Sequence, residues 1–270
     1  MISLLLLPRA LSNCKSNPKE DFINGVHRTY YIGHRGSKRS NSCENTYAAY
    51  LGGAKAGYDG LETDIRVSND GVFFCCHDND LTRLTAYESN QMNNDVNNSN
   101  FNDIKDVLIS SINTKNEKTP ATTLCLYEDY LKVCKKYHLI PIIELKWTNG
   151  INSKDFSNIP ALLEMIKKYN LEKSAFVMTS MKPCLEYIRS IDKNIHLQWL
   201  CMENITSGLD WAIKNNISID VEYQYCTQEI VDKLHQNGLY INIWTLNDEA
   251  FLEKYIDMGV DFVTTDILLK

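Results

Sequence analysis

The sequence lacks the surplus of basic residues that nucleic-acid-binding proteins usually carry. Its 28 Lys and Arg residues are outnumbered by 34 Asp and Glu residues, which gives a formal net charge of −6. Binding to nucleic acid normally needs a basic face that neutralises phosphates. We therefore expect no nucleic-acid partner. A small anionic ligand would need a local positive site, for which Arg35 and Lys146 are candidates.

The chain also lacks an apolar run long enough to cross a bilayer, and it lacks a C-x-x-C motif. A membrane-spanning helix needs about 20 consecutive apolar residues. Nine cysteines, an odd number, are scattered along the chain, so neither a zinc site nor a disulfide framework is indicated. We interpret them mostly as buried thiols in a reducing compartment and predict a cytoplasmic location.

The N-terminus lacks the features of a signal peptide. Residues 1–7 are apolar, but no basic residue precedes them and the apolar core is short. The run Leu11-Ser12-Asn13-Cys14 only weakly matches a lipoprotein cleavage box, because Asn13 is poor at a cleavage site. Export or lipid anchoring stays an alternative if translation begins at another residue.

The chain does have the length and apolar content for one large barrel. It has 270 residues, of which 44% are hydrophobic, and barrels of alternating strands and helices typically have about 250 residues. We predict one domain over residues 1–270, with an N-terminal extension at 1–28 that packs on the outside or the base of the barrel. Residues 79–120 are polar and Asn-rich, and we interpret them as an inserted segment that acts as a lid.

The groups suited to chemistry are concentrated in the stretch from Tyr30 to Asp78, where they follow predicted strands. A short β-rich run at residues 30–32 ends in His34 and Arg35, which places an imidazole and a guanidinium where a strand gives way to a loop. Residues 45–56 then have a helix-compatible composition and end at a glycine that can stop a helix.

Two carboxylates share one face of the next predicted strand. Residues 61–67 alternate apolar and polar side chains, so Glu62 and Asp64 point to the same side. An Asn-Asp-Gly turn returns the chain as a strand at residues 72–76 that ends at His77. Neighbouring carboxylates repel each other unless a cation lies between them, so the pattern predicts a hard-cation site with oxygen ligands. Histidines beside it could donate and accept protons near neutral pH.

The motifs HRG, ENT, E-x-D and HD, in this order, closely resemble the glycerophosphodiester phosphodiesterase family. Further motifs extend the resemblance from Tyr30 to Asp266, since PIIELKW resembles the family's third strand and NIWTLN and VTTD resemble its last two strands. The resemblance implies an α/β fold, a (β/α)8 TIM barrel with a small insertion after the second strand. Two positions depart from the family, because Cys43 and Ile267-Leu268 stand where prolines are usual.

The resemblance also implies roles for individual residues. The acid and base would be His34 and His77. The metal ligands would be Glu62, Asp64 and Glu144, with Mg²⁺ or Ca²⁺ as the cation. The substrate contacts would be Arg35, Glu44, Lys146 and Trp244. Because Glu44 and Asn45 also open a predicted helix, a structural capping role is the alternative for both.

From Thr122 onward, strands and helices alternate, which is typical of parallel βα units. We predict that Thr122 or Thr123 caps a helix that runs through residues 130–137, and that the dense apolar run at 140–145 is a buried strand. Counted from Tyr30, the pattern predicts eight strands, with no full helix after the last one.

The resemblance implies a metal-dependent phosphodiesterase that hydrolyses small glycerophosphodiesters to an alcohol and glycerol 3-phosphate, with two histidines as general acid and base. One alternative is a related barrel enzyme of the phospholipase or sphingomyelinase type that acts on lipid phosphodiesters. Another is a non-catalytic module that binds a phosphate ligand. The attacking oxygen is either water or a hydroxyl of the glycerol. We assign no catalytic role to His27, His138, His196 and His235, which have no partner signature.

Overall fold

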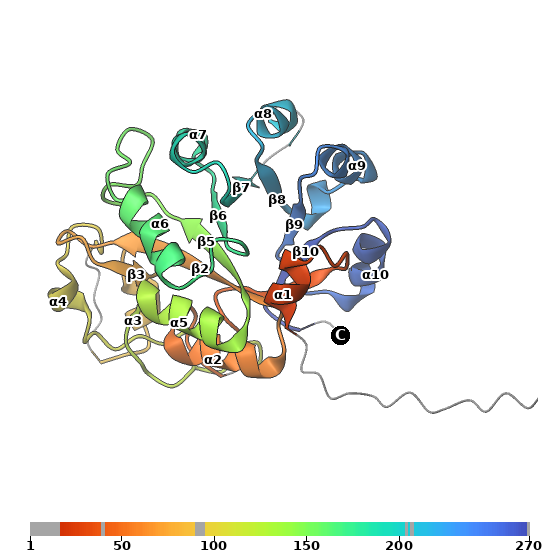
Figure 1. The fold of residues 1–270 in the computed structure, drawn as a ribbon. Helices are drawn as coiled ribbons and strands as arrows, with labels where there is room; N and C mark the ends of the chain where they lie inside the picture. The colour runs from red at the N-terminus through yellow and green to blue at the C-terminus, as the bar shows by residue number, and fades with distance from the viewer. Residues whose placement is uncertain (1–16, 39–40, 90–94, 203–204, 206–207, 269–270) are drawn as a thin grey trace, which may run out of the picture.

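The computed structural model describes residues 17–38, 41–89, 95–202, 205 and 208–268. Eight parallel strands form a barrel, which closes where β1 pairs with both β10 and β2 (Figure 1). The predicted (β/α)8 fold is thereby confirmed. The barrel strands are β1 (Tyr30–Gly33), β2 (Gly60–Val67), β5 (Ile140–Leu145), β6 (Phe176–Thr179), β7 (His196–Cys201), β8 (Ser218–Glu222), β9 (Ile241–Trp244) and β10 (Phe262–Thr265).

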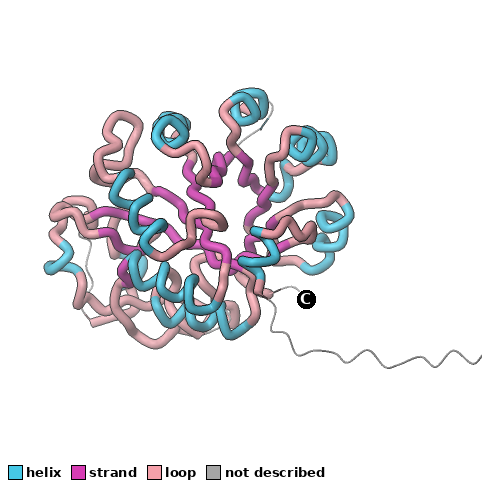
Figure 2. Tube along the Cα trace, viewed as in Figure 1, coloured by secondary structure: helices cyan, strands magenta, loops and turns pink. Residues whose placement is uncertain are grey.

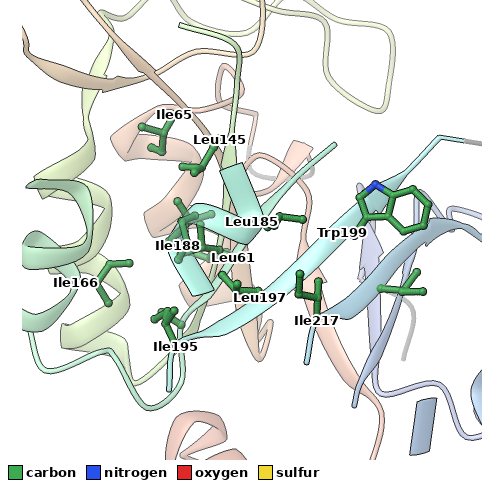
Figure 3. Packing of buried hydrophobic residues seen from close by; sticks show 14 of the residues in the cluster. Leu61, Ile65, Leu145, Ile166, Leu185, Ile188, Ile195, Leu197, Trp199 and Ile217 are labelled. Atoms are coloured by element: carbon green, nitrogen blue, oxygen red, sulfur yellow. The ribbon is translucent and has the colours of Figure 1, made fainter. Parts of the chain in front are cut away.

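Helices lie on the outside of these strands (Figure 2). They are α2 (Tyr47–Ala56), α5 (Tyr127–Tyr137), α6 (Ile159–Lys168), α7 (Lys182–Ile191), α8 (Leu209–Lys214), α9 (Gln228–Gln236) and α10 (Glu249–Asp257), and a short 3-10 helix, η3 (Tyr223–Tyr225), follows β8. The apolar outer faces of the strands pack against the helices, as Figure 3 shows for Leu197 of β7 near Leu185 and Ile188 of α7. Burying one such side chain contributes about 1.5–3 kcal/mol to folding.

Local sequence explains one helix start and corrects another. The Thr46 hydroxyl accepts a hydrogen bond from the Ala49 amide at 3.3 Å, so Thr46 caps α2 and the helix begins at Tyr47. The prediction that Thr122 or Thr123 caps the next long helix is wrong. A short strand, β4 (Cys125–Leu126), intervenes, and α5 begins at Tyr127 without a side-chain cap.

The inserted segment packs beside the barrel around a small core of its own. The antiparallel strand β3 (Phe73–Cys75) pairs with both β2 and β4, and the described residues between β3 and β4 include the one-turn helices α3 (Thr82–Thr85) and α4 (Phe101–Ile104). Their side chains form an apolar cluster that includes Phe74, Leu81, Leu84, Val96, Ile104 and Ile109. Among the described residues of the segment, Asn79 and Asp80 at its start line the cavity described below, and the role of the segment as a lid stays a prediction.

The helix α1 (Pro18–Ile23) lies at the base of the barrel, where the described part of the N-terminal extension was expected to pack. The Phe22 ring lies 5.5 Å from the ring of Phe176 and 5.8 Å from that of Phe262, measured between centroids. It also contacts the rings of His196 and Tyr240, so His196 is part of this layer and lies far from the strand ends that carry chemistry. Residues 1–16 lie outside the described part of the chain.

Candidate active site

A cavity of about 590 Å³ opens at the carboxyl ends of the barrel strands. Of the nine residues assigned from the sequence, seven line it: His34, Arg35, Glu62, His77, Glu144, Lys146 and Trp244. Asp64 and Glu44 lie directly behind this lining and are almost fully buried. The carboxyl face of such a barrel is where active sites are built, because all strand ends converge there.

Three carboxylates meet in this cavity. Glu62 and Asp64 lie on β2, and the strand register places Asp64 opposite Glu144 of β5. One carboxylate oxygen from each lies within 4.8 Å of the others. Three oxygen ligands so close together match the ligand type and spacing that Mg²⁺ and Ca²⁺ use, with water or substrate completing the coordination.

The electrostatics of this cluster fit a cation as well. Burial and the charges of Asp64 and Glu144 raise the pKa of Glu62 well above its usual range. Burial, joined by the charge of Asp64, raises the pKa of Glu144 to about 7 although Lys146 opposes the shift. Burial opposes ionisation of Asp64 too, but Lys146 and Arg35 outweigh it and lower its pKa. Without a cation, the cluster is therefore held as a mixture of charged and protonated acids.

His34 follows β1 and is oriented by a carboxylate. Its Nδ1 lies 2.8 Å from Oδ1 of Asp266, the residue that follows β10. Asp266 is itself fixed by the side-chain amide of Asn247 at 2.8 Å and by the Lys38 ammonium at 3.0 Å. Burial lowers the pKa of His34, although the hydrogen bond with Asp266 opposes this. The ring thus has its Nδ1 engaged and its Nε2 as the atom that can exchange a proton with a ligand.

His77 is oriented in the same way from another direction. Its Nδ1 lies 2.7 Å from Oδ1 of Asp78, whose other oxygen accepts a hydrogen bond from Arg83 Nε at 2.7 Å. The contact of His77 with Arg66 is through the backbone, because Arg66 Nη2 donates to its carbonyl oxygen at 2.7 Å. Two histidines, each held by its own carboxylate, therefore line one cavity with the metal-type cluster.

Arg35 is fixed at the centre of the acidic groups. It has a φ of 50°, in the left-handed region, and its amide donates to Glu62 Oε2 at 2.7 Å. Its Nη1 donates to Glu44 Oε1 at 2.8 Å, and its Nε lies 3.4 Å from Asp64. Burial disfavours the charge on Arg35, but Asp64, Glu44 and Glu62 outweigh it and raise its pKa. The guanidinium stays charged and faces the cavity.

Glu44 lies behind Arg35 and does not line the cavity. Both of its oxygens accept hydrogen bonds from Arg83, at 2.7 and 3.0 Å. Burial would raise the pKa of Glu44, but the hydrogen bonds from Arg83 and the charge of Arg35 lower it to about 2. Its geometry suits the positioning of the two arginines, and its contact with substrate stays a prediction.

Lys146 and Trp244 complete the sequence-assigned set. The Lys146 ammonium lies 3.0 Å from Asp64 Oδ1 and also pairs with Glu144, so a positive charge borders the acidic cluster. Trp244, at the end of β9, lines the cavity as predicted from its place at a strand end. His235 instead pairs with Asp261 at 3.0 Å and is not part of the cavity lining.

Sequence reasoning missed two arginines that organise the site. Arg66 lines the cavity, and its position two residues after Asp64 on the same strand face could have revealed it. Arg83 joins Glu44 to Asp78, but it belongs to the inserted segment and no motif marks it. A contact between residues 39 positions apart depends on how the insertion folds.

No helix within the described residues is long and apolar enough to cross a membrane. All eight cysteines in the described part of the chain are buried free thiols, as the sequence predicts.

Comparison with known proteins identifies one family. The model of the glycerophosphoryl diester phosphodiesterase family matches residues 34–269. Among curated relatives, a glycerophosphodiester phosphodiesterase of Caldanaerobacter subterraneus is 26% identical over 88% of this chain and 94% of its own length. One from Bacillus altitudinis is 27% identical, also over 88% of this chain and 94% of its own.

Solved structures share the fold. A glycerophosphodiester phosphodiesterase from Thermotoga maritima has a TM-score of 0.67 at 24% identity and covers 89% of this chain and 95% of its own. An Oleispira antarctica phosphodiesterase, solved in complex with the product sn-glycerol-3-phosphate, has a TM-score of 0.72 at 16% identity and covers 90% of this chain and 95% of its own. The chain belongs to the glycerophosphoryl diester phosphodiesterase family and is an enzyme of that class, a phosphoric diester hydrolase.

Proposed function

We propose that this enzyme hydrolyses small glycerophosphodiesters to an alcohol and sn-glycerol 3-phosphate, with a divalent cation and with His34 and His77 as base and acid. The observation that carries the proposal is the pair of imidazoles in one cavity, each bound through Nδ1 to a carboxylate, beside three clustered acids. The product bound to the Oleispira antarctica relative supports the same choice of substrate.

Glu62, Asp64 and Glu144 would hold the cation, Mg²⁺ or Ca²⁺, which when bound would neutralise charge on the phosphodiester. Arg35 presents a planar guanidinium that suits a phosphate, and Lys146 adds a second positive charge beside it. These two residues would position the phosphate between the imidazoles and stabilise the charge that develops on it in the transition state.

The two histidines differ in environment, and this supports separate roles. Burial keeps the His34 imidazole neutral more readily, which suits a base that takes a proton from the attacking oxygen. His77 is more exposed, and the Asp78 carboxylate fixes its ring through Nδ1, which leaves Nε2 to deliver a proton to the leaving oxygen. Protonation of the leaving oxygen by His77 would avoid release of a strongly basic alkoxide. The attacking oxygen is either that of water or a hydroxyl of the glycerol. With the glycerol hydroxyl as nucleophile, the reaction would proceed through a cyclic phosphate.

Turnover of glycerophosphocholine tests this proposal most directly. We expect release of choline and sn-glycerol 3-phosphate in the presence of Mg²⁺ or Ca²⁺, and loss of turnover in excess chelator. A product that stops at a cyclic phosphate would identify the glycerol hydroxyl as the nucleophile. Absence of any phosphate product with either cation would contradict the proposed reaction.

We also place the protein in the cytoplasm. The buried free cysteines support a reducing compartment, since cysteines of secreted domains more often form disulfides. The weak cleavage-box match at Leu11 to Cys14 lies outside the described residues. Fractionation of cells that express the full chain, with detection of the N-terminus, would test the placement.

A further inference from the structure

Asp220 is a buried acid on the cavity wall to which no role has been assigned. It lies on β8, is only 1% exposed, and lines the same cavity as His34 and Glu144. Among the described residues, its Oδ1 has no hydrogen-bond partner. Because buried polar groups in proteins are nearly always paired and this one lines the cavity, a bound ligand is a suitable partner for it.

A second unpartnered group lies beside it. The indole Nε1 of Trp244 is buried and has no partner among the described residues, although the side chain lines the cavity. In the register of β8 and β9, Asp220 lies opposite Asn242, and Trp244 lies opposite Glu222. Asp220 and Trp244 are therefore diagonal neighbours on adjacent strands and face the same interior.

Asn242 and Thr264, two buried polar side chains next to this pair on β9 and β10, are already hydrogen-bonded to each other. Asn242 Nδ2 donates to Thr264 Oγ1 at 3.1 Å, and the Thr264 hydroxyl donates back to Asn242 Oδ1 at 3.2 Å. This reciprocal pair leaves Asp220 and Trp244 as the groups directed to a ligand. The metal-type carboxylates lie on other strands, β2 and β5.

The chemistry of the two groups selects hydroxyls. Indole Nε1 is only a donor. Burial, with the charge of Glu144, raises the pKa of Asp220 well above its usual range, so the carboxyl can carry a proton and can both donate and accept. A vicinal diol offers both donors and acceptors at short spacing, whereas a quaternary ammonium head group offers neither.

We propose that Asp220 and Trp244 form a subsite for the hydroxyls of the glycerol moiety, deep in the cavity on the β8–β9 wall. The alcohol to be released then lies toward the mouth, beside the exposed side chains of Trp147 and Met202, which are 61% and 59% exposed. This orientation rests on the proposed function. It explains how one site could fix the common glycerol and tolerate different alcohols.

The test compares two phosphodiesters in the metal-loaded enzyme. Glycerophosphocholine carries the diol, and bis(p-nitrophenyl) phosphate does not. We define the ratio as kcat/KM for glycerophosphocholine divided by kcat/KM for bis(p-nitrophenyl) phosphate. We expect Asp220→Ala to lower this ratio about tenfold to hundredfold, the usual effect of one lost hydrogen bond in a buried site. Asp220→Asn, which keeps a donor, an acceptor and nearly the same shape, should lower the ratio less. This variant shows whether the effect of Asp220→Ala comes from a folding defect.

Gln198 provides a matched control on the neighbouring strand β7. It is fully buried, both of its side-chain amide atoms lack partners among the described residues, and it is not part of the cavity lining. Gln198→Met should change the melting temperature while it leaves the ratio near that of the wild type. If Asp220→Ala lowered kcat/KM equally for both substrates, Asp220 would act through the acidic cluster. If it changed kcat/KM for neither substrate, Asp220 would bind no hydroxyl. Either result overturns the proposal.

Product binding separates this inference from the proposed function. We expect Asp220→Ala to weaken calorimetric binding of sn-glycerol 3-phosphate about tenfold or more, and to leave binding of inorganic phosphate unchanged. Equal weakening of both ligands would overturn the subsite. If the wild type turned over neither diester, the hydrolase proposal would fail, and this binding comparison would still decide whether the subsite exists.

Discussion

The side chain of Arg66 holds the backbone of His77. Its Nη2 and Nε both donate to the His77 carbonyl oxygen, at 2.7 and 3.3 Å. Its Nη1 donates to the carbonyl of Trp147 at 3.0 Å and to the side chain of Asn97 at 3.4 Å. One buried guanidinium thus joins a proposed catalytic residue to the loop after β5 and to the inserted segment. No carboxylate within the described residues forms an ion pair with it.

Arg66→Lys should lower kcat more than it raises KM. Lysine cannot reproduce the planar set of donors, so the His77 backbone should lose its fixed position while the phosphate contacts stay intact. We expect a fall in kcat of about tenfold to hundredfold, because small displacements of catalytic groups have large effects. Steady-state kinetics and the pH profile of kcat would measure it.

Arg189 is the control for this prediction. It lies on α7, away from the cavity, and donates to the carbonyls of Asp192, Lys193 and Asn216. Arg189→Lys should lower the melting temperature without a change in kcat. Equal kinetic effects of the two substitutions would show that Arg66 acts only through global stability.

Loss of either histidine should reveal which is the acid. The pH profile of kcat/KM should be bell-shaped, and His34→Ala or His77→Ala should each lower kcat by about two to four orders of magnitude. A p-nitrophenol leaving group needs no acid, so the variant that lacks the acid should recover on that substrate. We expect recovery for His77→Ala. Near wild-type rates of both variants on glycerophosphocholine would contradict the two-histidine mechanism.

Removal of the cation should abolish turnover, and addition of Mg²⁺ or Ca²⁺ should restore it. Glu62→Gln should act mainly through the metal, so we expect weaker cation binding but an intact barrel. The metal-free variant should be at least as stable as the metal-free wild type, because the charge repulsion around Glu62 is relieved. Calorimetric titration with the cation and thermal melts would check both points, and full activity in excess chelator would rule out the metal mechanism.

The stability of the metal-free protein should depend on Glu144. Its folded-state pKa of about 7 lies above the ordinary value of 4.5, so its stabilising contribution is complete below about pH 4.5 and is lost as the pH rises through about 7. In excess chelator, the melting temperature of the wild type should therefore fall relative to that of Glu144→Gln between about pH 5 and about pH 8. The lowered pKa of His34 changes the stability with pH in the opposite direction, but both proteins contain His34, so the difference between their melting temperatures cancels this contribution. A constant difference across this range would contradict the raised pKa.

The inserted segment should influence the choice of alcohol through Asp80, which lines the cavity. The Asp80 carboxylate also accepts a hydrogen bond from the Thr82 amide at 2.8 Å, which an Asn side chain can retain. Asp80→Asn should therefore raise KM for glycerophosphocholine, whose choline group is cationic, by a few-fold at low salt and leave KM for glycerophosphoinositol unchanged. Equal KM changes for both substrates would show that the charge of Asp80 does not select the alcohol.

Most of the fold and much of the site could be predicted because they follow from local patterns. The alternation of Glu62 and Asp64 on β2 and the strand ends at His34 and Trp244 place polar groups at one rim of a parallel barrel. The start of α5 could not be placed this way, since it depends on the pairing of β3 with β4 across the insertion.

Other parts of the site depend on contacts that no local pattern encodes. Glu44 matched a family motif, but only the fold shows that Arg83 occupies both of its oxygens. Asp220 lies in the sequence Ser-Ile-Asp-Val-Glu, where an acid between apolar residues of a strand resembles a solvated sheet face. Only closure of the barrel turns that face inward.

The aromatic layer at the base of the barrel has a consequence for the order of folding. Phe22 of α1 packs on Phe176, His196, Tyr240 and Phe262, which belong to the second half of the chain. During synthesis the N-terminal helix therefore has no complete docking surface until β10 has been made. Contacts between such distant segments form slowly because a large loop must close first. In pulse-labelling hydrogen exchange, the amides of α1 should become protected after those of β2 and β5, so α1 would be among the last helices to dock.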